Sequence, residues 1–206
     1  MKKFFAVLLA AVMAFACVSC GSSGAKLRFV TGGESGTYYG FGSVLAQHAT
    51  NNAGISVTGV VGAGSKSNIN ELEDGNAELA FCQSDVMAYA YQGTNLFDAP
   101  VTCFSTVAAL YTEQVQIVTI DESIKTVADL AGKKVSVGAA GSGVYFNAVD
   151  ILSAYGIGEL DADGKFTQID ATYQSFGDSA DALKDGKIVG CTATGDKETE
   201  GIGSKV

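Results

Sequence analysis

Apolar positions along the chain change repeatedly between the alternation typical of strands and the three-to-four-residue spacing typical of helices. The pattern predicts strands at 26–31, 55–61, 79–82, 107–111, 115–120, 135–137 and 166–173. It predicts helices at 38–50, 66–74, 86–91, 127–134, 144–155 and 179–184. Strands that alternate with helices favour right-handed crossovers and a largely parallel sheet, so we expect an α/β fold.

The order of strand, glycine-rich loop and helix begins again near Asp121, which indicates a second α/β lobe. We assign residues 26–117 to the first lobe and residues 118–188 to the second. From residue 189 onward the chain loses its apolar period and becomes rich in Gly, Lys and Glu. We therefore predict that residues 189–206 form a disordered tail.

The first residues have the features of an export signal. Lys2 and Lys3 precede an apolar stretch at 4–18, which is too short to span a membrane and is soon followed by Gly and Ser. Ser19 and Cys20 before this tether resemble a bacterial lipobox. We expect a lipoprotein signal peptide at 1–19, a tether at 20–25 and a lipid on Cys20, with Cys17 as the alternative. The protein would then lie outside the cytoplasm, held to the cell membrane by its lipid anchor only.

Charge and cysteine spacing exclude several classes of protein. Lys and Arg number 13 against 22 Asp and Glu, and loss of the two lysines in the signal leaves 11 − 22 = −11. An acidic chain without a basic run has no surface for nucleic acid. Cys82, Cys103 and Cys191 lack a CxxC spacing, so neither a metal site nor a disulfide framework is predicted. Free buried thiols are expected, with a Cys82–Cys103 bridge as the alternative.

Two glycine-rich loops, 31–37 and 138–143, carry the candidate binding chemistry. Each follows a predicted strand and opens a helix, where backbone N–H groups and the helix dipole favour an anion. One loop in each lobe would hold a carboxylate or phosphate from opposite sides; the alternative is that the glycines only form tight turns. Neither loop has P-loop or dinucleotide spacing, so no cofactor is expected.

Three other residues are candidates near the predicted lobe junction or at a helix start. Asp85 either accepts a hydrogen bond from a ligand amino group or caps a helix. Tyr111 and Glu113 either close over a ligand or form a solvated turn. The only histidine, His48, is expected to be a partly buried structural residue. No nucleophile elbow or HExxH motif is present, so we predict a protein without enzymatic activity.

Four stretches together resemble the TAXI family of TRAP-transporter substrate-binding proteins: 29–39, 75–85, 109–113, and 129–138 with its continuation to 143. The resemblance implies a type II periplasmic-binding-protein-like fold of two α/β lobes. It implies a small carboxylate solute, either a glutamate-like amino acid or a dicarboxylate, and a TRAP membrane permease as partner. With Ser35 and Thr37 of the first glycine loop, the implied cleft residues are Thr31, Gly33, Tyr38, Gly64, Ser65, Gln83, Asp85, Tyr111, Glu113, Ser142 and Gly143.

The chain departs from the family pattern after residue 188. Family members continue with an apolar strand and many more residues, so the resemblance implies that the second lobe is incomplete here. The expected mechanism is closure without chemistry, with the second lobe swinging about segments near 113–121. The alternative function is a lipid-anchored surface remnant of such a receptor that binds no solute.

Overall fold

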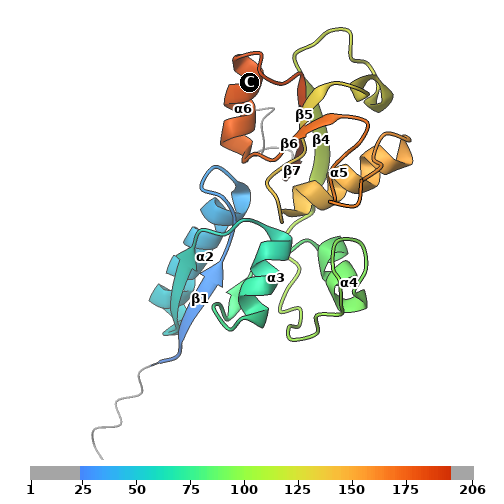
Figure 1. Cartoon of the computed structure of the whole chain (residues 1–206). Coiled ribbons are helices and arrows are strands. Elements are labelled where there is room, and N and C mark those ends of the chain that lie inside the picture. The colour runs from blue at the N-terminus through green and yellow to red at the C-terminus, as the bar shows by residue number, and fades with distance from the viewer. Residues whose placement is uncertain (1–23, 196–206) are drawn as a thin grey trace, which may run out of the picture.

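The computed structural model describes residues 24–195, which form two α/β lobes (Figure 1). The first lobe contains a three-stranded parallel sheet with the strand order β2-β1-β3. Its strands are β1 (Lys26–Val30), β2 (Ser56–Val60) and β3 (Leu79–Ala80). Its helices are α2 (Thr37–Ala53), α3 (Ser65–Glu73) and α4 (Ser84–Gln92). The parallel pairing places the carboxyl ends of these strands, and the loops that follow them, at one edge of the sheet.

The second lobe contains a four-stranded sheet with the strand order β4-β7-β5-β6. Its strands are β4 (Gln114–Thr119), β5 (Lys134–Ser136), β6 (Asp170–Thr172) and β7 (Gly190–Gly195). Its helices are the short 3₁₀ helix η1 (Val127–Leu130), α5 (Gly143–Ala154) and α6 (Phe176–Lys184). β5 is parallel to β6 and β7, whereas β4 is antiparallel to β7. This sheet is therefore mixed rather than largely parallel.

The prediction of a disordered tail from residue 189 was wrong for its first part. Gly190–Gly195 forms β7, which lies inside the second sheet between β4 and β5. Cys191, Thr192, Ala193 and Thr194 are all buried. The segment contains only Gly, Cys, Thr and Ala, without a large apolar side chain, so it carried no hydrophobic strand signal. The rest of that segment, 196–206, lies outside the described residues, as do the predicted signal peptide and Cys20.

Several local predictions also need correction. The segment 107–111 forms no strand and belongs to the connection between α4 and β4. The helix predicted at 127–134 is the single 3₁₀ turn η1. Cys82, Cys103 and Cys191 are free thiols, but Cys103 is exposed because it lies in this connection rather than in a buried strand. His48 is exposed on α2 beside Asn52, whose amide nitrogen lies 3.3 Å from its ring.

Helix α5 connects the cores of the two lobes. Leu152 and Ala148 of this helix are buried in the second-lobe core with Leu130 and Val135. Phe146, from the same helix, is instead buried in a cluster of first-lobe residues, namely Ile69, Val86, Ala90, Phe97 and Val101. Figure 1 shows α5 lying directly over α3 and α4. Phe146 thus carries apolar packing from the second lobe into the core of the first.

Two features are absent from residues 24–195. None of the helices there combines the length and the apolar character that crossing a bilayer requires. No group of three or more His, Cys, Asp or Glu side chains there is arranged to hold a metal ion.

Candidate functional site

A cavity of about 280 Å³ lies between the two lobes. The first lobe contributes both loops that follow β1 and β2, and the second lobe contributes the loop after β5 and the start of α6. The lining residues are Gly32, Gly33, Ser35, Gly36, Thr37, Tyr38, Gly62, Ala63, Gly64, Ser65, Gln83, Glu113, Ala139, Ser142, Gly143, Val144, Gln174, Ser175, Phe176 and Thr194. The two glycine-rich loops therefore border one common cavity.

Four helices begin at this cavity. The first residues of α2, α3, α5 and α6 are Thr37, Ser65, Gly143 and Phe176, and all four line it. Each helix N-terminus presents backbone N–H groups and the positive end of its dipole. Helix α2 begins after a glycine and has no side-chain cap. Helix α3 also has no side-chain cap, whereas Ser142 caps α5 and Ser175 caps α6. The helix dipoles favour an anion along these helix starts, although no cationic side chain of the described residues lines the cavity.

Some of these backbone donors already bind the opposite lobe. The amides of Lys66 and Ser67, at the start of α3, donate to the carbonyl oxygen of Gly141 at 3.0 and 3.2 Å. The amide of Gly177, at the start of α6, donates to the Ser35 hydroxyl at 3.2 Å. Each glycine-rich loop thus caps a helix of the other lobe, and these contacts hold the lobes together around the cavity.

Two glycines make the close approach of the lobes possible. Gly64 has a φ of 103°, and a Cβ on it would lie 2.9 Å from the Cα of Ser142. A Cβ on Gly143 would overlap the side-chain oxygen Oε1 of Gln83. The glycines in these loops are therefore required by the contact between lobes as well as by local turns.

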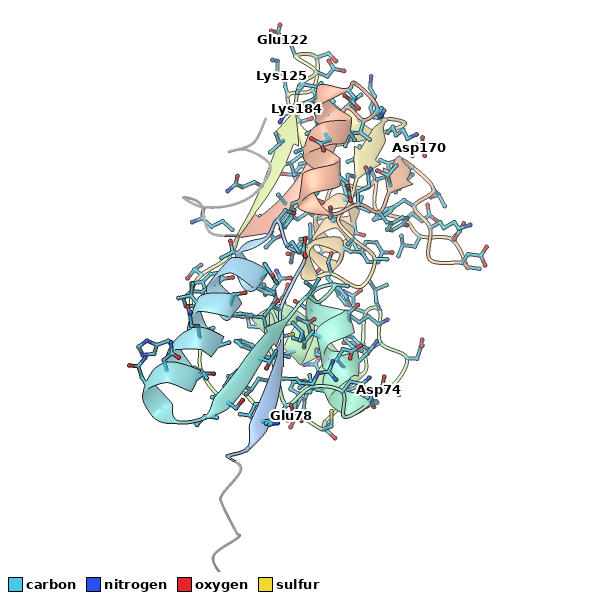
Figure 2. The ribbon with its side chains drawn as sticks, turned by 90° about the vertical axis from the view of Figure 1, so that its left-hand side faces the viewer. Asp74, Glu78, Glu122, Lys125, Asp170 and Lys184 are labelled. Carbon is cyan, nitrogen blue, oxygen red and sulfur yellow. The ribbon has the colours of Figure 1, made fainter. Side chains whose placement is uncertain are left out.

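Glu113 carries the only formal charge among the cavity-lining residues of the described chain. The Tyr38 hydroxyl donates to its carboxylate oxygen Oε2 at 3.2 Å. Burial, and then the nearby Glu113 charge, raise the pKa of Tyr38, so this phenol stays protonated and remains a donor. The charged side chains labelled in Figure 2 lie at the far ends of the two lobes, away from the junction.

The structure brings ten of the thirteen predicted cleft residues to the cavity and leaves Thr31, Asp85 and Tyr111 outside it. The Thr31 hydroxyl is buried and donates to the carbonyl of Val60 at 2.7 Å. Asp85 lies in the first turn of α4 rather than at its N-cap position, which belongs to Gln83, and its carboxylate accepts from the Val86 amide of the same turn at 2.8 Å. Binding of a ligand by the ten lining residues stays a prediction.

Tyr111 lies in a second, larger groove of about 1,020 Å³ beside the cavity. Its ring packs edge-on against Tyr38, with the ring centroids 6.5 Å apart. The groove is bordered by α2, β3 and the connection at 103–113, and its walls include Leu45, Leu72 and Leu110. Tyr111 is thus separated from the cavity by the ring of Tyr38.

Sequence reasoning missed residues that belong to neither glycine-rich loop. Gln174 and Phe176 line the cavity from the segment that leads into α6, and Thr194 lines it from β7. Asn147, on α5, is hydrogen-bonded to Gln83 and Thr194 of the cavity wall. None of these residues stands in a recognisable motif, so only their positions in the folded chain identify them.

Several solved structures are similar to this chain. A protein of Bordetella bronchiseptica RB50 has a TM-score of 0.52 at 16% identity, over 82% of this chain and 50% of that one. The alkanesulfonate-binding protein SsuA from Xanthomonas axonopodis pv. citri, bound to MOPS, has a TM-score of 0.49 at 18% identity, over 83% and 55%. A TRAP solute-binding protein specific for aromatic acids, from an unidentified marine microbe, has a TM-score of 0.47 at 13% identity. The match covers 84% of this chain and 58% of that one.

This chain therefore spans between 50% and 58% of the length of these three solved structures. Sequence identities this low are evidence for a shared fold only. The two α/β sheets and the likeness to the Bordetella protein confirm the predicted α/β fold of two lobes. At the level of sequence, the model of the NMT1-like family matches residues 29–197, and because this match covers most of the chain, the protein belongs to the NMT1-like family.

Proposed function

We propose that this protein is an extracytoplasmic solute-binding receptor that captures a small carboxylate and passes it to a membrane transporter without catalysis. The observation that carries the proposal is the cavity at which four helices from two lobes begin. Its volume of about 280 Å³ is just below the range of about 300–1,000 Å³ for ligand pockets, which favours a small solute. Converging helix N-termini favour an anionic group on that solute.

The finer parts of the proposal come from the sequence. The TAXI-like stretches favour a TRAP permease as the partner, and the lipobox-like Cys20 favours attachment to the membrane by a lipid. The lobe boundary near residue 117 falls within β4, and we extend the second lobe to Gly195 because β7 completes its sheet. The solute would enter when the lobes separate about the segment near 113–121 and would be enclosed when they meet.

A thermal-shift screen of the purified full chain tests the proposal. The solutes are amino acids and dicarboxylates, with alkanesulfonates as a second anionic class. A solute at 100 times its Kd should stabilise the protein by about 2.7 kcal/mol, which raises the Tm by roughly 5–10 °C in a chain of this size. A shift with sulfonates alone would replace the carboxylate assignment. An unchanged Tm with every solute would favour the alternative function, a surface remnant of such a receptor that binds no solute.

A further inference from the structure

A partly buried polar junction lies behind the cavity wall, centred on Asn147 of α5. The Asn147 amide nitrogen Nδ2 donates to the carboxylate oxygen Oδ2 of Asp85 at 2.8 Å. The Asn147 amide oxygen Oδ1 accepts from Nε2 of Gln83 at 2.8 Å and from the hydroxyl of Thr194 at 3.0 Å. Asp85 and Gln83 belong to the first lobe, whereas Asn147 and Thr194 belong to the second. This junction therefore joins the lobes.

Asp85 fixes the direction of every hydrogen bond in the junction. A carboxylate can only accept, and Asp85 accepts from the Val86 amide through one oxygen and from Asn147 through the other. Asn147 must therefore turn its NH₂ group toward Asp85 and its oxygen toward Gln83 and Thr194. Both of these neighbours then have to act as donors toward Asn147.

These hydrogen-bond directions also decide which atoms face the cavity, because Gln83 and Thr194 line it. With Nε2 bound to Asn147, the remaining polar atom of the Gln83 amide is its oxygen Oε1, which lies against the cavity residue Gly143. With its proton given to Asn147, the Thr194 hydroxyl offers only lone pairs to other groups. Glu113 is a third acceptor on the same cavity.

The cavity thus has two unlike sets of groups. The helix N-termini are donors, suited to a carboxylate, whereas Gln83, Thr194 and Glu113 are acceptors, suited to an N–H or O–H group. A second carboxylate placed against the acceptors would meet lone pairs and the Glu113 charge. The best partner for both sets is a carboxylate that also carries a hydrogen-bond donor.

We propose that Asn147, oriented by Asp85, is the positioning residue that turns the acceptor atoms of Gln83 and Thr194 toward the cavity, and that the solute is accordingly an amino- or hydroxy-carboxylate. This inference rests on the proposed function as a receptor for small carboxylates. In this role Asp85 acts on the cavity through Asn147, although Asp85 does not line the cavity itself.

Three matched solutes test the inference by calorimetry: L-glutamate, 2-hydroxyglutarate and glutarate, which differ only in the amino, hydroxyl or hydrogen substituent at one carbon. The full chain should bind at least one of the first two about tenfold more tightly than glutarate, the difference expected for one hydrogen bond. The first two compared with each other distinguish an ammonium from a hydroxyl donor. Equal affinity for all three would overturn the inference.

Two variants separate positioning from simple folding. Asn147→Leu removes the junction and frees the Gln83 amide to turn, so the preference over glutarate should disappear. The double variant Asp85→Asn with Asn147→Asp exchanges the two groups, so the carboxylate moved to position 147 accepts from Gln83, from Thr194 and from the amide moved to position 85. The preference should return in the double variant. If a folded double variant does not regain the preference over glutarate, the positioning role of Asn147 is overturned.

A measurement without solute keeps the two proposals distinguishable. In the full chain, one Nε2 proton of Gln83 should exchange slowly with water by NMR, and this protection should be lost in Asn147→Leu and regained in the double variant. If none of the three solutes binds, the receptor proposal fails for this solute class while the protection pattern still decides the junction. Rapid exchange of that proton in the unaltered protein would overturn the junction itself.

Discussion

Gly143 illustrates that a glycine can be expected from the sequence although the contact that requires it is known only from the structure. The sequence places this glycine at the start of a helix, where small residues let a ligand approach the backbone. In the folded protein the missing side chain makes room for Gln83 of the other lobe, and the Ser65 hydroxyl oxygen would lie 2.8 Å from an added Cβ. The residue type was predictable, but the neighbour that requires it was not.

Replacing Gly143 by Ala should weaken solute binding about tenfold and should also lower stability by about 1–3 kcal/mol, because the contact between the lobes is overpacked. The added methyl group displaces the Gln83 amide and breaks its bond to Asn147, a loss typical of one hydrogen bond. Calorimetry and thermal unfolding give the two readouts. Gly40→Ala on α2 is the matched control, because nothing lies within 4 Å of the added Cβ. It should add about 0.5–1 kcal/mol of stability and leave affinity unchanged. Unchanged affinity in Gly143→Ala would contradict this account.

Most helices and strands were predictable as elements because their signals are local. Periodic apolar positions indicated α2, α5 and β4. The helix predicted at 66–74 is α3, which ends at Glu73, and Gly75 follows it with a φ of 70°. Strand β7 was missed because it contains no large apolar side chain. Only pairing with β4 and β5 makes that segment a strand.

Ala193→Asp should destabilise the second lobe by at least about 3 kcal/mol, because it buries an unpaired charge in β7. Ala193 is 2% exposed and packs with Ala182, Leu183 and Ile188. Urea unfolding followed by circular dichroism measures the loss. The same charge introduced at Val107, which is 85% exposed, should change stability by less than about 0.5 kcal/mol. Equal midpoints for the two variants would show that β7 is no part of the core.

The arrangement of the two lobes depends on contacts that no local pattern reports. Phe146 belongs to a helix of the second lobe but is fully buried among residues of the first. The Lys66 and Ser67 amides, which donate to Gly141 across the junction, have no earlier helical turn to bind. Their exchange with water should therefore report separation of the lobes.

Phe146→Ala should accelerate exchange at the Lys66 and Ser67 amides more than Leu152→Ala does. Both side chains are fully buried on α5, and both truncations should cost roughly 2–5 kcal/mol. Leu152, however, lies in the second-lobe core and not in the cluster that holds Phe146, so its loss should disturb the lobe junction less. Hydrogen exchange by NMR or mass spectrometry compares the two variants. Similar exchange of these amides in both variants would mean that Phe146 does not hold the lobes together.

The sequence by itself determined the α/β class, most elements and the two glycine-rich loops, because these follow from spacing and residue type along a short stretch. The tertiary structure decided which residues share the cavity and which way their hydrogen bonds run. Gln83 and Asn147 are 64 residues apart, and Asp85 and Asn147 are 62 apart, so their contact exists only once the lobes meet. Which atom of an amide side chain faces the cavity depends on its hydrogen-bond partners in space. These partners are far apart in the sequence, so local patterns do not reveal them.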